Sequence, residues 1–198
     1  MSKKKIAIQG ELGAYSHIAA ENLYKDSEIK TCTTFEETFK QAYNDPSYKI
    51  VIPIENSLAG RVADIHYLLP KYKLQIHGEH FQAVEHNLLC KPDATISDIK
   101  FVRSHAQAIG QCQNLIAKKK FKPIISADTA GSAKDLAEGK DKTIAAIASE
   151  LSAKIYNLKI LEKNIEDEKG NVTRFLIMGK NIEQPEFKKE KKFITSCI

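Results

Sequence analysis

Residues 48–60 read YKIVIPIENSLAG, and this stretch decides the fold. Its apolar and β-branched run is typical of a buried strand. The run ends directly in three polar side chains, Glu55, Asn56 and Ser57. Residues 56–69 then carry an apolar side chain every three or four positions, which predicts a helix. Because ligands of open parallel sheets bind where strands end and helices begin, this junction is a candidate site.

The same order of strand and helix recurs along the chain. Further strands that run into helical patterns are predicted at residues 4–9, 99–104, 122–127 and 143–149, and a closing strand is predicted at 173–179. Strands that alternate with such helices indicate an α/β fold with largely parallel sheets. Gly139 is typical of a residue at which a helix stops.

The domain organisation follows from one interruption of this order. Residues 72–90 are strand-like and lack a long helical pattern, as expected of a crossover between two lobes. We therefore expect two α/β lobes with a central cleft. The first lobe is predicted to hold residues 1–79 and the return strand 174–180, and the second lobe residues 80–173.

Composition narrows the class of protein. With 198 residues, 42% of them hydrophobic, the chain can bury a sizeable core. No segment approaches the roughly 18 apolar residues of a membrane span, and the N-terminal apolar run is short for a signal peptide, so a cytoplasmic protein without membrane contact is expected. The cysteines are too widely spaced for a zinc site or a disulfide framework, and free thiols are expected at Cys32, Cys90, Cys112 and Cys197.

Charge gives a second restriction. The net charge of +5 comes from lysines interleaved with 25 acidic residues, which favours an ordinary solvated surface over a nucleic-acid partner. Only Arg61, Arg103 and Arg174 are arginines among the 30 basic residues. Each is a candidate for two-pronged carboxylate binding, and each has an incidental surface role as its alternative.

Polar residues at four strand-to-helix junctions are predicted helix caps, namely Ser16, Asn56 or Ser57, Ser104, and Asp128 or Thr129. Capping alone explains each residue taken singly. Together they favour a cleft for a small anionic ligand, since helix N-termini attract anions. The dinucleotide, P-loop and Gly-x-Ser-x-Gly signatures are all missing from the sequence, and the histidines form no helical metal pair.

Seven segments resemble, in order, the motifs of prephenate dehydratases. They are GELGAYSHIAA, VIPIENSLAGRVADIHYLLP, HNLL, RSHAQAIGQCQ, DTAGSAK, AAIAS and NVTRFLIM, and the resemblance covers residues 4–180. The resemblance implies the two-lobed fold of type 2 periplasmic binding proteins. It also implies a lyase that converts prephenate to phenylpyruvate, with loss of water and carbon dioxide, in phenylalanine biosynthesis. No metal or organic cofactor and a homodimer or homotetramer are expected from the same resemblance.

The resemblance also assigns catalytic residues. Thr173 would donate a hydrogen bond to the departing hydroxyl, because a threonine is too weakly acidic to be a bulk proton source. Ser104 and Gln111, seven positions apart, are expected to share a helix face that points into the cleft. Asn56 would supply a further donor. Glu55 would order its loop or donate a proton if its pKa is raised.

Substrate binding is assigned in the same way, to Ser16, Ser57, Thr129, Arg174 and Phe175. Arg174 is expected to hold a carboxylate, with a salt bridge between the lobes as the alternative. His86 and His105 remain alternative proton donors.

Two rival functions stay open at this point. Arogenate dehydratases share the scaffold, and a non-enzymatic binding domain would share the fold and the cleft. Residues 181–198 form a charged tail, where many family members begin a regulatory ACT domain that binds phenylalanine. We therefore expect the chain to be active and insensitive to phenylalanine, since an effector needs a second site.

Overall fold

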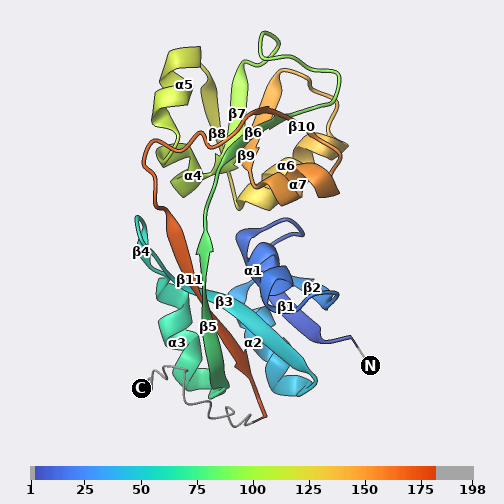
Figure 1. The fold of residues 1–198 in the computed structure, drawn as a ribbon, viewed down its shortest axis with the longest axis vertical. Helices are drawn as coiled ribbons and strands as arrows, with labels where there is room; N and C mark the ends of the chain where they lie inside the picture. The colour runs from blue at the N-terminus through green and yellow to red at the C-terminus, as the bar shows by residue number, and fades with distance from the viewer. Residues whose placement is uncertain (1–2, 182–198) are drawn as a thin grey trace.

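A computed structural model describes residues 3–181 and has two lobes, one above the other in Figure 1. The first lobe contains a six-stranded sheet of order β2-β1-β3-β11-β5, with β4 paired to β3. Its strands are β1 (Lys5–Gln9), β2 (Glu28–Cys32), β3 (Tyr48–Asn56), β4 (Gly60–Arg61), β5 (Gln75–Ala83) and β11 (Val172–Gly179). Its helices are α1 (Tyr15–Leu23), α2 (Phe35–Asn44) and α3 (Ala63–Tyr72).

The second lobe contains a five-stranded sheet of order β10-β6-β9-β7-β8. Its strands are β6 (Asn87–Cys90), β7 (Phe101–His105), β8 (Lys122–Ser126), β9 (Ile144–Ala148) and β10 (Lys159–Glu162). Its helices are α4 (Ala106–Gly110), α5 (Gln113–Lys119), α6 (Thr129–Glu138) and α7 (Glu150–Ile155). Gly139 is the C-cap of α6, so the predicted helix stop is confirmed.

The two sheets share one plan. In each, three parallel strands come first, and the next strand is antiparallel and enters directly from the other lobe. That strand is β11 in the first lobe and β6 in the second, so the chain crosses between the lobes twice (Figure 1). Three strands of each sheet pair in parallel, as expected, and the antiparallel strands β11 and β6 make both sheets mixed. The strand β5 continues to Ala83 in the first-lobe sheet, a few residues past the expected boundary at 79.

Two predicted helices have different bounds in the structure. The helix expected from residue 56 begins only at Ala63, because Gly60 and Arg61 pair with β3 as the short strand β4. The helical pattern expected directly after the predicted strand 99–104 is broken between Gly110 and Gln113 into α4 and α5. The strands β2 and β10 and the helix α2 have no counterpart among the elements predicted from the sequence.

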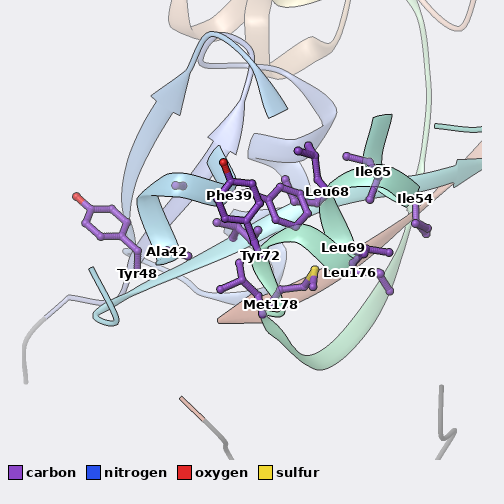
Figure 2. Close-up of a cluster of buried hydrophobic side chains, with 14 of the residues drawn as sticks. Phe39, Ala42, Tyr48, Ile54, Ile65, Leu68, Leu69, Tyr72, Leu176 and Met178 are labelled. Atoms are coloured by element: carbon purple, nitrogen blue, oxygen red, sulfur yellow. The ribbon is translucent and has the colours of Figure 1, made fainter. Parts of the chain in front are cut away.

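Each lobe has its own hydrophobic core. In the first lobe, Phe39 of α2 and Tyr72 of α3 pack with their ring centroids 5.7 Å apart, close to Ile54 of β3 and Met178 of β11 (Figure 2). Burying one such side chain contributes about 2 kcal/mol. Among the described residues, none of the four clusters of buried hydrophobic side chains spans both lobes. The lobes therefore meet through polar contacts, and the space between them is not filled by a core.

The helices of the described region are all too short or too polar to span a membrane.

Candidate functional site

A bulge in β3 brings the central site residues onto one face of the first-lobe sheet. Thr173 of β11 pairs with Asn56 of β3, and Phe175 pairs with Pro53. Two steps along β11 therefore correspond to three steps along β3. The extra residue in β3 is a β-bulge, which re-aims the side chains beyond it. As a result Pro53, Asn56, Thr173 and Phe175 all face the space between the lobes.

These residues form one wall of a cleft of about 520 Å³ between the lobes. The second lobe supplies the opposite wall from the ends of its strands and the first turns of its helices. Of the residues singled out from the sequence, those that line the cleft are Ser16, Asn56, Arg61, His86, His105, Gln111, Asp128, Thr129, Thr173 and Phe175.

The side-chain amide of Asn56 has a fixed direction. Its Oδ1 accepts the backbone N–H groups of Leu58 and Ala59, at 3.0 and 2.9 Å. Its Nδ2 therefore points the other way and donates to Thr173 Oγ1, at 2.9 Å, and to Asn171 Oδ1, at 2.6 Å. Because the Thr173 oxygen accepts this bond, its own O–H proton is left to donate to a molecule in the cleft.

The chain of hydrogen bonds continues into the second lobe. Asn171 Nδ2 donates to Gln111 Oε1, at 2.9 Å, and the same oxygen lies 2.9 Å from His86 Nε2. Since that oxygen only accepts, Nε2 carries the ring proton. Asn171 was not among the residues expected from the sequence, although its position two residues before Thr173 places both on the same face of an extended chain.

The far end of this chain lies at the crossover between the lobes. Tyr15 Oη is 3.0 Å from His86 Nδ1 and donates to the Glu85 carbonyl, at 2.7 Å. Burial lowers the pKa of His86, while the hydrogen bond to Gln111 and the charge of Glu166 oppose this shift. Burial also raises the pKa of Tyr15 well above its ordinary value, with smaller contributions from nearby acidic groups. Both side chains are therefore neutral, and the ring proton of His86 is already bonded within the protein.

Ser104 and Gln111 do not share a helix face, so that expectation is wrong. Ser104 is the fourth residue of β7 and Gln111 follows the end of α4. The Ser104 hydroxyl is fully buried and donates to the Ile147 carbonyl, at 2.7 Å. Only Gln111 of this pair reaches the cleft.

Glu55 and Ser57 lie outside the cleft lining. Glu55 is exposed, and its backbone lies opposite Arg61 of β4 and Arg174 of β11 in the sheet register. The Ser57 hydroxyl donates to the Gly170 carbonyl, at 3.2 Å, and accepts the Val172 N–H, at 3.0 Å. The Ser57 side chain therefore links the end of β3 to the start of β11 through these two hydrogen bonds.

Arg174 points away from Thr173. Its Nε and Nη2 donate to Glu79 Oε2, at 2.7 and 2.6 Å, from β11 to the neighbouring strand β5. Both strands belong to the first lobe, so this ion pair does not join the lobes. Arg174 is also missing from the cleft lining, and the structure does not place it where a bound carboxylate would lie.

Only one of the four expected helix caps is present. Asp128 caps α6 and its Oδ1 accepts the Gly131 N–H, at 2.6 Å, so the N-terminus of α6 already holds a carboxylate of the protein itself. Ser16 lies inside α1, and its hydroxyl donates to the Gln9 carbonyl, at 3.1 Å. At the other three junctions, the N-caps of α1, α3 and α4 are Ala14, Val62 and His105.

Within residues 3–181 no group of three or more His, Cys, Asp or Glu side chains is placed to hold a metal ion. The three cysteines of this region, Cys32, Cys90 and Cys112, are free and buried, as expected, and Cys197 lies outside it. Burial raises the pKa of the Cys112 thiol to about 12. This thiol is therefore uncharged at neutral pH.

Two lobes with sheets of the same mixed order, joined by two crossovers and enclosing a cleft, define the class of two-lobed α/β proteins built like type 2 periplasmic binding proteins. Within this class the cleft lies on the carboxyl ends of the parallel strands, where ligands bind. The chain belongs to the prephenate dehydratase family, whose family model matches residues 6–183.

Comparison with known proteins gives the same family. The chain is 40% identical over 175 residues to a bifunctional N-acyl-homoserine lactone acylase/prephenate dehydratase of Komagataeibacter europaeus, covering 88% of this chain and 62% of that protein. It is 41% identical over 179 residues to the chloroplastic arogenate dehydratase/prephenate dehydratase 2 of Arabidopsis thaliana, covering 90% of this chain and 47% of that protein. The crystal structure of the prephenate dehydratase from Staphylococcus aureus subsp. aureus Mu50 superposes with a TM-score of 0.77 at 28% identity, over 90% of this chain and 67% of that one.

Proposed function

We propose that the cleft catalyses the conversion of prephenate to phenylpyruvate in phenylalanine biosynthesis. The observation that carries this proposal is the bond from Asn56 to Thr173, which leaves one hydroxyl proton directed into the cleft. Family membership supports the reaction, and the hydroxyl and amide groups among the lining residues supply hydrogen-bonding partners for the oxygen atoms of the substrate.

The reaction needs little covalent chemistry from the protein. In prephenate the bond from the ring to its carboxylate breaks, and its electron pair enters the ring as the bond from the opposite ring carbon to the 4-hydroxyl breaks. The carboxylate leaves as carbon dioxide, and the hydroxyl takes up one proton and leaves as water. Aromaticity of the product supplies much of the driving force, so positioning and a well-aimed donor can supply most of the catalysis.

Thr173 assists the departing oxygen. Its hydroxyl donates a hydrogen bond that strengthens as negative charge develops on the leaving group, while the proton consumed overall comes from solvent. Asn56 holds the Thr173 oxygen as an acceptor, Asn171 accepts a second bond from Asn56, and Gln111 accepts a bond from Asn171. Thr129 and Ser16 are further cleft residues with hydroxyl groups, and Phe175 offers an apolar surface to the ring.

One assay tests the proposal and its two rivals. The chain is incubated with prephenate, and phenylpyruvate is measured by its absorbance in alkali. A parallel incubation with arogenate is analysed for phenylalanine. Formation of phenylpyruvate supports the proposal, turnover of arogenate alone assigns the chain to arogenate, and binding of prephenate without turnover of either compound identifies a non-enzymatic binding domain.

A cytoplasmic location and a homodimer or homotetramer complete the proposal. The assembly is supported by resemblance to the family. Light scattering at working concentration tests the assembly, and a monomer alone would contradict it.

A further inference from the structure

The three arginines of the chain have different surroundings. Arg103 pairs with Asp135 at 3.3 Å, and Arg174 pairs with Glu79 at 2.6 Å. Arg61 is exposed, lines the cleft, and forms no ion pair with any carboxylate of the described region. It is therefore the arginine whose two-pronged donor is available to a ligand.

The turn before Arg61 is held by Asn56, which is itself a residue of the site. Gly60 and Arg61 pair with Asn56 and Glu55 of β3, and the Val62 N–H donates to the Ile54 carbonyl, at 3.1 Å. Gly60 has a φ of +79°, a conformation that favours glycine, and this closes the turn that the Asn56 side chain also holds. The backbone that carries the guanidinium is thus fixed relative to Asn56 and Thr173.

The charges of the other cleft residues determine how much the Arg61 guanidinium matters for binding an anion. Among residues 3–181, the lining contains Asp64 and Asp128 and no lysine, so Arg61 is its single permanent cation within this part of the chain. The N-terminus of α6 cannot serve as an anion site in its place, because Asp128 occupies it. A ligand that carries carboxylates therefore meets two protein carboxylates and one guanidinium.

We propose that Arg61 binds a carboxylate of the substrate through two parallel N–H···O bonds, and that it determines the preference of the cleft for dianions. This inference rests on the proposed function, because prephenate supplies the two carboxylates. It assigns to Arg61 the role that the sequence favoured for Arg174.

Steady-state kinetics with prephenate test the assignment. Arg61→Gln is expected to raise KM about 100-fold, the usual scale for loss of a charge-assisted pair, with a much smaller effect on kcat. Arg61→Lys keeps the charge and loses the fork, so its KM is expected to lie between those of the wild type and Arg61→Gln. The matched control is Arg103→Gln, which removes an arginine outside the cleft and is expected to leave KM unchanged.

The outcomes separate this inference from the proposed function. A wild-type chain that binds but does not turn over prephenate would contradict the proposed function. An active wild type with an Arg61→Gln variant whose KM stays within about twofold would overturn the role of Arg61, as would a loss of kcat at constant KM. Circular dichroism establishes that the variants fold, and if Arg61→Gln fails to fold, an unchanged KM in Arg61→Lys together with unchanged salt dependence of KM overturns the inference.

Discussion

Thr173 owes its proposed role to its neighbours and not to its own acidity. A threonine hydroxyl is both a donor and an acceptor, and either part can be used inside a protein. Here Asn56 donates to the oxygen, and Asn56 is itself held by two backbone N–H groups. The direction of the Thr173 hydroxyl proton is thereby set by hydrogen bonds in the turn that follows Asn56, at Leu58 and Ala59.

Thr173→Ala is expected to lower kcat about 100-fold or more while KM stays close to the wild-type value, because the hydroxyl acts chiefly as the carbon–oxygen bond breaks. Thr173→Ser keeps the hydroxyl and is expected to retain most of kcat. The measurement is the initial rate of phenylpyruvate formation over a range of prephenate concentrations. An alanine variant that keeps more than about a tenth of kcat would rule out this role for the hydroxyl.

The lowered pKa of the buried His86 leads us to expect a pH dependence of the free energy of unfolding. Burial lowers its folded-state pKa below the 6.5 of an unfolded chain, so the unfolded chain binds more protons as the pH falls through that value. The free energy of unfolding is therefore expected to decrease below pH 6.5, by at most about 1.4 kcal/mol per pH unit from this one group, and to be independent of His86 above it.

Urea denaturation at pH 7.5 and 5.5, both chosen as about one unit from the ordinary histidine pKa, measures this effect. In His86→Gln the decrease between the two values is expected to be smaller, though some remains because burial also lowers the pKa of His17. His66→Gln, at an exposed histidine of α3, is the control and should match the wild type. An unaltered decrease in His86→Gln would show that His86 does not titrate as described.

Among the elements, β3 brings a hydrogen-bond donor, Asn56, into the cleft, whereas α6 brings a carboxylate, Asp128. The bulge in β3 turns Asn56 into the cleft, whereas a regular strand would turn it to the other face. At α6 the capping residue adds a negative charge to the cleft. Stability of the helix and affinity for an anion are therefore in conflict at Asp128.

Two substitutions at Asp128 separate these effects. Asp128→Ala removes the cap and is expected to lower the free energy of unfolding by about 1 kcal/mol, whereas Asp128→Ser retains a capping oxygen and should lose much less. Both remove a carboxylate from the cleft and are expected to lower KM for prephenate. Denaturant titration and kinetics on the same samples measure the two effects, and a KM that rises in both variants would mean that Asp128 contacts the substrate favourably.

In the whole molecule, the loop before α1 joins the lobes on one side of the cleft. The Gly13 carbonyl accepts the hydroxyls of Ser149 and Ser152, at 2.6 and 3.1 Å, and the Leu12 carbonyl accepts the Tyr156 hydroxyl, at 3.0 Å. Gly13 has a φ of +92°, and a Cβ there would lie 2.8 Å from Ser152 Cα. The close approach of the lobes thus depends on a missing side chain.

Gly13→Ala is expected to force the lobes apart and to strain the backbone, so both kcat and the free energy of unfolding should fall, the latter by about 1 to 3 kcal/mol. The control is Gly110→Ala in α4, where a Cβ meets nothing within 4 Å and the substitution should be neutral or slightly stabilising. Small-angle scattering compares the shapes of the two variants. Wild-type dimensions and activity in Gly13→Ala would contradict the proposed packing.

The sequence by itself determined the alternation of strands and helices, the two lobes and the family, because periodicity and motif order are local properties of the chain. It also indicated Asn56, Gln111 and Thr173 before their positions were known. Tertiary structure alone decided which arginine remained available, since Glu79 is 95 residues from Arg174 and nothing local predicts their ion pair. It likewise decided the direction of the Asn56 amide and the contact of Asn171 with Gln111, 60 residues away, because hydrogen bonds between distant segments depend on how the sheets pair and not on sequence spacing.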